Sequence, residues 1–288
     1  MPTTTKGYDP LFLGTDHQID FPTLTGKVKE HALKGGEIFD FTHFSLVMNK
    51  ETKFALYSIA IVDKYKHRNI ERGNNDWHYD ERIGKNNQVG DELYEQNDWD
   101  RGHLTRRYDI CWGDQAEQAN YDSFCWANIT LQHHDFNTGI WNDLENWLLD
   151  YVEDGGEMIV TTGPVHKDND SEYCGVHQPS GCKIKVPYGF WKSITFVDQN
   201  QSLRTLAFII RQYKNAHDNL ATRFKPLKTY QVPLTTITRE TEIEFDKKQY
   251  DTNPLFFFAN PTTAEKDIQT PEAYLIENKT DIILDRNI

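Results

Sequence analysis

Three polar residues, His103, Asn137 and Glu145, have the types and spacing that a single-metal phosphodiester hydrolase needs. A neutral imidazole is the natural general base near neutral pH, so the histidine can take a proton from water. The asparagine offers a neutral oxygen to Mg²⁺, an ion that keeps several waters and takes few protein ligands. The glutamate can hold one of those waters. Positions 137, 141 and 145 recur every four residues and would share one face of a helix.

Arg101 stands two positions before His103 in the sequence Asp100-Arg101-Gly102-His103. If this segment is a strand, both side chains project to the same face. An arginine beside a general base can neutralise the negative charge that develops in phosphoryl transfer. Gly102 would let a phosphate approach the backbone closely.

Each of these residues also has an ordinary explanation, because short motifs occur by chance in many proteins. His103 could be a histidine without a chemical role. Asn137 immediately precedes an expected helix, where asparagine is a favoured N-cap. Glu145 could be an exposed helix carboxylate, and Trp141 is expected to pack in the core rather than to act chemically.

Length and charge restrict the class of protein. The 288 residues are 38% hydrophobic and 13% aromatic, which indicates a folded chain of one large or two small domains. The net charge of −13 is unusual for a nucleic-acid enzyme, because cationic side chains drive phosphate binding. Residues 204–228 alone carry +5, which leaves −18 for the remainder. That basic stretch is either a solvated face or a track for the substrate backbone, whereas Arg106 and Arg107, close to His103, are expected to bind substrate.

The four cysteines, Cys111, Cys125, Cys174 and Cys182, include no CxxC pair, so a structural zinc site is not expected. Cys174 and Cys182 flank a loop rich in Gly, Pro and Ser and could form a disulfide in an oxidising compartment. No apolar run approaches the ~20 residues of a membrane helix. No secretory signal is visible, so we expect a cytoplasmic protein as written, or a secreted or periplasmic one if the numbering follows signal removal.

The elements that must position the candidate residues form an α+β pattern with a mainly antiparallel central sheet and flanking helices. Residues 1–35 are expected to form an N-terminal extension, and residues 64–98 to form long surface loops. The expected strands are 44–48 and 53–63 (a hairpin), 99–104, 124–131, 158–162, 190–197 and 203–211. The expected helices are 138–152, ended by Gly155-Gly156, and 235–245, with Pro233 near its start.

Several motifs in order resemble the DNA/RNA non-specific endonuclease family, which includes mitochondrial endonuclease G. The resemblance covers roughly residues 40–250. It is carried by Asp100-Arg101-Gly102-His103, Ala127-Asn128-Ile129-Thr130-Leu131-Gln132, the run Phe136 to Glu145, Thr162-Gly163-Pro164, Val186-Pro187, Phe190-Trp191-Lys192 and Tyr230-Gln231-Val232-Pro233. Several motifs in the right order are far more specific than one.

This resemblance implies a ββα-metal nuclease fold. We expect the nuclease domain to span residues 36–260 and residues 261–288 to form a C-terminal extension packed on the same domain. The resemblance also implies that His103 is the general base, that Asn137 is the one direct side-chain ligand of Mg²⁺ (with Mn²⁺ as a substitute), and that Glu145 holds metal-bound water. Arg101 would contact the phosphate and Asn128 would line the site. The products would carry 5′-phosphate and 3′-hydroxyl ends.

The chain departs from the family at the arginine that commonly precedes the tryptophan matched by Trp77. Asn75 stands there, and either Arg72, reaching in from a nearby loop, or another basic residue is the candidate replacement. Losing one preorganised charge donor typically costs ~10²–10³ in rate, which slows an enzyme without abolishing its activity. Leu131 also replaces a family proline.

The expected partners are double- and single-stranded DNA and RNA, together with an inhibitor or regulatory protein and a second copy in a homodimer, and no membrane. Two other functions stay open. One is a catalytically silent nucleic-acid-binding or interaction module that kept the fold. The other is an enzyme acting on small nucleotides or another phosphodiester.

Overall fold

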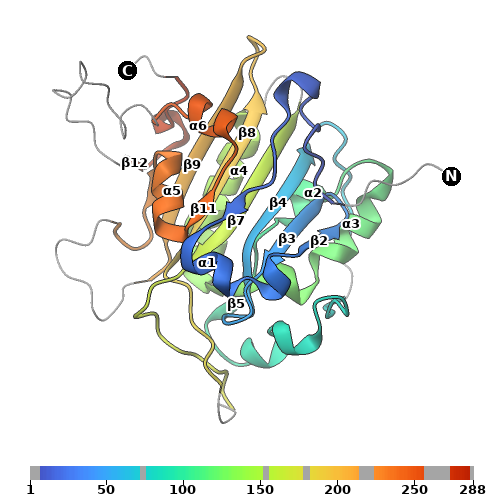
Figure 1. Ribbon diagram of the computed structural model, residues 1–288, viewed down its shortest axis with the longest axis vertical. Coiled ribbons are helices and arrows are strands. Elements are labelled where there is room, and N and C mark those ends of the chain that lie inside the picture. Colours follow the sequence, from blue (N-terminus) through green and yellow to red (C-terminus); the bar gives the residue numbers. More distant parts are fainter. Residues whose placement is uncertain are drawn as a thin grey trace.

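The structure is a computed structural model that describes residues 7–71, 76–151, 156–177, 182–213, 224–255 and 273–285. Its centre is an eight-stranded sheet in the order β12-β10-β9-β8-β7-β4-β3-β2, in which every neighbouring pair is antiparallel (Figure 1). The expected antiparallel central sheet is therefore confirmed. Its strands are β2 (Ile38–Phe41), β3 (Phe44–Met48), β4 (Ala55–Asp63), β7 (Glu157–Val165), β8 (Gly189–Val197), β9 (Leu203–Arg211), β10 (Thr229–Gln231) and β12 (Tyr274–Ile276).

The long central strands are buried on both faces, which explains why their sequences read as continuous apolar runs. Successive side chains of a strand point to opposite faces. In β8, Phe190 and Ile194 pack in one apolar cluster, and Trp191 packs in the cluster on the other side of the sheet. The sheet is thus the middle layer of three.

Helices cover both faces of this sheet (Figure 1). On one face lie α2 (Arg107–Ile110), α3 (Ala116–Ser123) and α4 (Asn142–Tyr151), with Leu144 and Leu148 of α4 in the apolar cluster. On the other face α5 (Leu234–Thr241) contributes Leu234 and Ile237. The remaining helices are α1 (Gly26–His31) and α6 (Lys247–Thr252), and a small sheet pairs β1 (Thr23–Leu24) with β11 (Ile243–Glu244).

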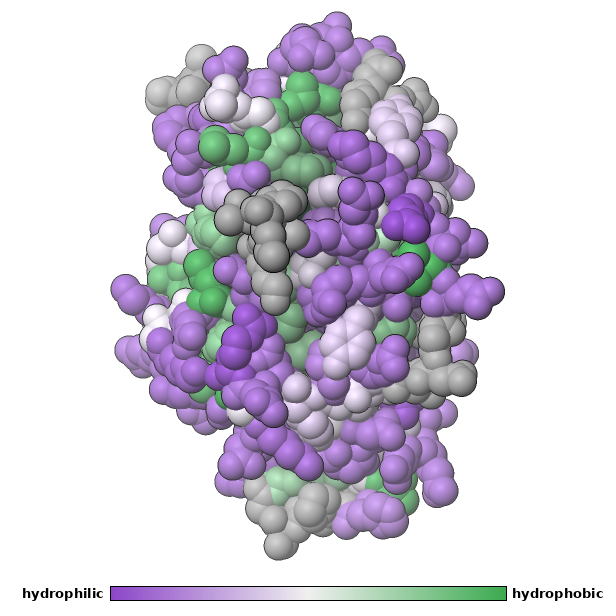
Figure 2. All heavy atoms as spheres, turned by 90° about the vertical axis from the view of Figure 1, so that its right-hand side faces the viewer, coloured by the Kyte–Doolittle hydropathy of each residue, from purple (hydrophilic) through white to green (hydrophobic). Residues whose placement is uncertain are grey.

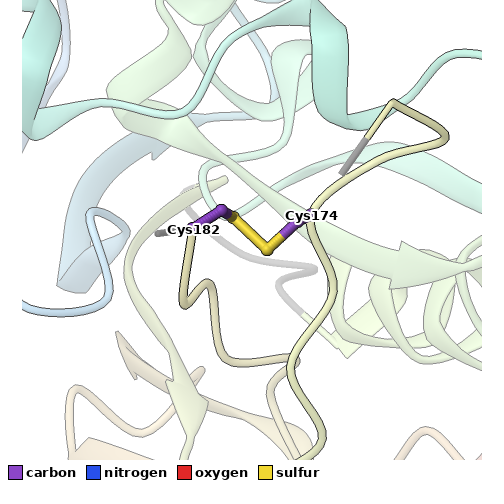
Figure 3. The surroundings of a disulfide bond; sticks show 2 residues. All are labelled: Cys174 and Cys182. Atoms are coloured by element: carbon purple, nitrogen blue, oxygen red, sulfur yellow. A yellow bond between two sulfur atoms is a disulfide. The ribbon is translucent and has the colours of Figure 1, made fainter. Parts of the chain in front are cut away.

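A separate two-stranded antiparallel sheet, β5 (Trp99–His103) with β6 (Ile129–His133), contributes Trp99, Ile129 and Leu131 to a third apolar cluster. The long loop between β7 and β8 packs Ile184 and Val186 into the same cluster. A disulfide joins Cys174 to Cys182 within that loop (Figure 3). The bridge that the sequence left open is therefore present, and Cys111 and Cys125 are free and buried.

Several sequence predictions of element boundaries are wrong. The helix expected over 138–152 begins regularly only at Asn142, because residues 136–141 form a π-helical segment in which Gly139 has φ −102° and ψ −110°. The strand expected over 124–131 is interrupted by a 3₁₀ turn at Trp126–Asn128, so β6 starts at Ile129. The helix expected over 235–245 ends at Thr241, because Glu242 adopts a left-handed conformation and the chain then enters β11.

The expected surface loops of residues 64–98 contain no strand in their described part, but Val89, Leu93 and Tyr94 are buried in the third cluster. The face that lies to the right in Figure 1 is mostly hydrophilic, with small separate hydrophobic areas (Figure 2). Within the described ranges, every helix is too short or too polar to span a membrane.

Candidate active site

The two-stranded sheet β5–β6 fixes the backbone of His103 at the end of β5, where this residue pairs with Ile129 of β6. The buried side chain of Asn128 holds the next turn of chain. Its Oδ1 accepts a hydrogen bond from the Thr105 amide at 2.9 Å, and its Nδ2 donates to the Thr105 carbonyl at 3.0 Å. The Leu104 amide also donates to the Asn128 carbonyl. Asn128 was expected to line the site, but it instead supports the segment that follows His103 from the protein interior.

Gly102 is required by its neighbour on β6 rather than by an open approach to the backbone. A Cβ built at this glycine would lie 2.2 Å from Cδ of Gln132, whose side chain is fully buried. The expectation that Gly102 leaves room for a phosphate is therefore corrected. The glycine lets the Gln132 side chain cross β5, and this tight packing fixes the backbone immediately before His103.

Asn137 is not a helix N-cap, since it lies inside the π-helical segment and Asp135 occupies the capping position without a side-chain bond. Its Nδ2 donates a 2.9 Å hydrogen bond to Oδ2 of Asp100. The same carboxylate also faces Nδ1 of His134 at 3.1 Å. With Nδ2 held in this way, Oδ1 is the remaining acceptor of the Asn137 amide. Because the Nδ2 hydrogen bond fixes the amide, this neutral oxygen has a defined position, and such an oxygen is a suitable ligand for Mg²⁺.

Glu145 is buried between two cations instead of lying exposed on its helix. Its Oε1 lies 3.2 Å from the ammonium of Lys192, and its Oε2 lies 3.4 Å from Nε of Arg106. Only 8% of its surface is exposed. The carboxyl group is thus held in one orientation, because each of its oxygens faces a cationic side chain.

Lys192 is a site residue that the sequence analysis did not single out for a role. It is 1% exposed and lies on β8 directly opposite Thr162 of β7, to whose hydroxyl its ammonium donates a 2.9 Å hydrogen bond. On the next strand Ser58 of β4 pairs with Thr162 and contacts the hydroxyl of Thr105. The signal available in the sequence was a row of polar residues inside otherwise apolar strands.

Asp109 of α2 completes this buried group of charges. Burial raises the pKa of its carboxyl to about 6, Arg106 opposes that shift and Glu145 adds to it. Its Oδ1 lies 3.8 Å from Nη1 of Arg106. Arg106 also donates to the side-chain oxygens of Asn142 and Asn146. Its guanidinium is therefore committed to the protein, which makes Arg106 a support for Glu145 as well as a residue of the pocket wall.

A pocket of about 490 Å³ collects most of the candidate residues. It is lined by His103, Arg106, Arg107, Tyr108, Asn137, Thr138, Trp141, Asn142 and Glu145. The described lining of this pocket includes neither Arg101 nor Asn128. Arg72 lies outside the part of the chain that the structure describes. Trp141 is buried against Phe136 and Phe190, which is the packing role expected of it.

The side chain of Arg101 lies beside Trp77 and Tyr94, two aromatic residues of the third apolar cluster. Its guanidinium lies 5.5 Å from the ring centre of Trp77 and 5.8 Å from that of Tyr94, and it pairs with the carboxylate of Asp91. The ring of Trp77 in turn lies 5.9 Å from that of His103. Arg101 and His103 are therefore on the same side of the strand, as expected, with one tryptophan beside both.

In the described part of the basic stretch of residues 204–228, Lys225 is exposed, and the other cations are paired or buried. Arg204 pairs with Asp198 and Asp285, and Lys228 pairs with Glu277. Arg211 is buried. Two further members, Lys214 and Arg223, lie outside the described residues. The paired side chains have their charge neutralised locally.

The described residues contain no group of three or more His, Cys, Asp or Glu side chains that could hold a metal ion. A carboxylate cage such as Ca²⁺ prefers is therefore not the arrangement found here. A single amide oxygen beside a fixed carboxylate and a histidine is the arrangement found, and it suits an ion that keeps most of its waters.

Comparisons with known proteins give consistent results. Residues 26–252 match the family model described as DNA/RNA non-specific endonuclease. The uncharacterized protein y4fB of Sinorhizobium fredii is 35% identical over 266 residues, which cover 83% of this chain and 39% of that protein. The chain therefore spans well under half of that relative. Mitochondrial endonuclease G of Bos taurus is 22% identical over 76% of this chain and 73% of its own length.

Among solved structures, the crystal structure of an EndoG/EndoGI complex matches with a TM-score of 0.59 and 17% identity. The match covers 78% of this chain and 91% of that one. At this level of identity the likeness establishes a common fold.

Proposed function

The chain belongs to the DNA/RNA non-specific endonuclease family, a family of metal-dependent nucleases with the ββα-metal fold, and from this premise we propose that it hydrolyses internal phosphodiester bonds of DNA and RNA. The observation that carries the proposal is that His103, Asn137 and Glu145 line one pocket. A silent binding module has no need for all three groups around one cavity.

The proposed roles follow from the contacts. His103, held by the two-stranded sheet β5–β6, takes the proton of the attacking water. Asn137 would offer Oδ1 to Mg²⁺, for which Mn²⁺ can substitute, and the hydrogen bond from Nδ2 to Asp100 fixes the orientation of the amide. Glu145 holds a water of the ion, and Lys192 with Arg106 keeps its carboxylate in place. When bound, the ion supplies Lewis-acid stabilisation of the phosphate charge and of the leaving 3′ oxygen.

Little sequence preference is expected, because contacts to phosphates position a protein without specifying bases. Arg107 and Arg101 are the proposed phosphate contacts, Arg101 after its release from Asp91. Arg72 remains the proposed replacement for the family's second arginine. Cleavage falls with rising salt, since binding is driven by counterion release.

The test is cleavage of supercoiled plasmid and of a structured RNA, in Mg²⁺ and in EDTA, by the wild type and by His103→Ala. The expected result is metal-dependent cleavage of both substrates, with a loss of about 10²–10⁴-fold in the variant. His31→Ala, at an exposed histidine of α1 outside the pocket, is the matched control and keeps wild-type activity. Retained binding without metal-dependent cleavage would instead support the silent module, and cleavage of short phosphodiesters alone would support the small-substrate enzyme.

We keep three further assignments as proposals. Residues 36–260 form the nuclease domain, with residues 1–35 and 261–288 as extensions packed on it, which the core positions of Tyr8 and Ile19 and the pairing of β12 with β10 support. An inhibitor or regulatory protein and a homodimer remain the proposed protein partners, the first supported by the inhibited EndoG complex. The disulfide favours a secreted or periplasmic location over the cytoplasm.

A further inference from the structure

Tyr108 is an exposed aromatic side chain in the wall of the catalytic pocket. The described wall also contains the imidazole of His103 and the ring of Trp141, and Trp141 is buried. Tyr108 in contrast is 46% exposed. A tyrosine has an apolar ring and a polar tip, and Tyr108 leaves part of that surface open in the pocket.

The ring of Tyr108 is held in place before any ligand arrives. It stacks on the imidazole of His67 with the ring centres 3.8 Å apart and an interplanar angle of 26°. The backbone of His67 is anchored by a bridge to Trp112. The guanidinium of Arg106, which also faces Glu145, lies over the Tyr108 ring at 5.4 Å from its centre. A fixed ring loses little side-chain entropy when a second planar group packs on it.

Positive charge stands next to this ring in the chain. Arg107 lines the same pocket, and its Nη1 donates to the carbonyl of Ile70 and to Oδ1 of Asn120, which are neutral acceptors. Among the residues that the structure describes, no carboxylate forms an ion pair with Arg107. Its charge is therefore available to a phosphate, unlike that of Arg106, which faces Glu145 and Asp109.

We infer that Tyr108, stacked on His67, is a base-stacking subsite for an unpaired nucleotide of the substrate, and that Arg107 contacts the phosphate of that nucleotide. The inference rests on the proposed nuclease function and names the substrate form that the pocket prefers. A base in a duplex is already stacked and paired, so only single-stranded or locally opened nucleic acid can use the tyrosine. Stacking of this kind tolerates every base, because each has a π-face.

The test is fluorescence anisotropy in EDTA with a labelled 12-residue oligothymidylate and an abasic tetrahydrofuran oligomer of equal length. Removing a stacked aromatic typically costs about 1–3 kcal/mol per base, which is about 5- to 150-fold in affinity. Tyr108→Ala should lose that factor for oligothymidylate and keep the wild-type affinity for the abasic oligomer. Tyr108→Trp, which retains a π-face, should keep the preference for bases. Arg107→Gln should weaken both ligands equally, because both carry the same phosphates.

Tyr121 provides the matched control. It is 43% exposed and stacks on His78 with 4.2 Å between ring centres, but it lies outside the pocket wall described above. Tyr121→Ala should bind both oligomers as the wild type does. Equal losses for the two oligomers in Tyr108→Ala, or no loss for either, would overturn the inference.

Plasmid cleavage in Mg²⁺ separates this inference from the proposed function. A wild type that cleaves DNA but shows no base preference through Tyr108 leaves the nuclease standing and removes the subsite. A wild type that binds bases through Tyr108 but cleaves nothing in Mg²⁺ keeps the subsite and removes the nuclease.

Discussion

Replacing Lys192 by methionine tests the buried charge group most directly. Methionine keeps an unbranched chain of four heavy atoms in place of the lysine stem but carries no ammonium, so Glu145 loses the cation 3.2 Å from Oε1. At that separation the attraction is about 5 kcal/mol for an effective dielectric constant of about 20. Removing one partner of a buried pair typically costs about 3–5 kcal/mol, because the other charge stays buried. Since Arg106 still faces Oε2, we expect a loss near the lower end, about 3 kcal/mol.

The assay is urea unfolding at pH 7, with the slope of the transition checked against the wild type to exclude a change in the unfolded state. Thr162→Val is the matched control, because it removes only the hydrogen bond that Lys192 donates and should cost about 1 kcal/mol. The double variant Lys192→Met with Glu145→Gln should be more stable than the sum of the single changes predicts, since it leaves no unpaired carboxylate.

Binding of Mn²⁺, followed by electron paramagnetic resonance, gives a readout that does not depend on turnover. Loss of an outer-shell partner typically weakens metal affinity about 10–100-fold. A folded Lys192→Met protein that loses under about 1 kcal/mol, and whose double variant shows only additive effects, would refute the idea that Lys192 holds Glu145.

Three further changes test other parts of the site. Gly102→Ala should destabilise the fold by about 1–3 kcal/mol, because its Cβ would lie 2.2 Å from Cδ of Gln132, and adding Gln132→Ala should restore stability measured by urea unfolding. The folded pKa of Asp109 is raised from 3.8 to about 6, so the folded state holds this proton more tightly than the unfolded state, and stability from this group falls as pH rises through that window. Asp109→Asn should therefore gain stability relative to the wild type between those pH values, and a constant difference between the two proteins would contradict the assignment. Asp91→Asn releases Arg101 from an exposed ion pair worth about 0–1 kcal/mol, so binding of DNA at low salt should tighten by up to about 5-fold and this gain should vanish at high salt.

The sequence predicted the central strands well because their burial pattern is a local property. The nine-residue strands β4, β8 and β9 are mainly apolar, aromatic and β-branched, which fits a strand buried on both faces. The helix α3 was missed because its buried positions include Ala116, Ala119 and Ser123, which give little apolar periodicity. The irregular start of α4 depends on the backbone at Gly139, which no side-chain pattern reveals.

The site was predictable where spacing along the chain mattered and not where packing across the chain mattered. His103, Asn137 and Glu145 were expected together and line one pocket. Lys192 was not expected to take part, because a lysine in a strand ordinarily faces solvent and its burial depends on a carboxylate supplied by α4. Asn128 has its partner groups in the backbone at Thr105 and Ser123, so its inward position could not be read from its neighbours in sequence.

The strands β4 and β7 are paired neighbours in the sheet, yet residues 64–156 between them contain the two-stranded sheet β5–β6 together with α2, α3 and α4. The chain thus leaves the sheet at one strand, builds almost the whole catalytic pocket, and returns at the adjacent strand. The described lining of the candidate pocket, residues 103–145, therefore belongs to a single segment inserted between two adjacent strands of the sheet. One constraint on any exchange of this segment is the contact of Lys192 with Glu145, because that lysine comes from the sheet itself. A graft of this segment between relatives should therefore keep the lysine and the glutamate together, as well as the apolar contacts of α4 with the sheet.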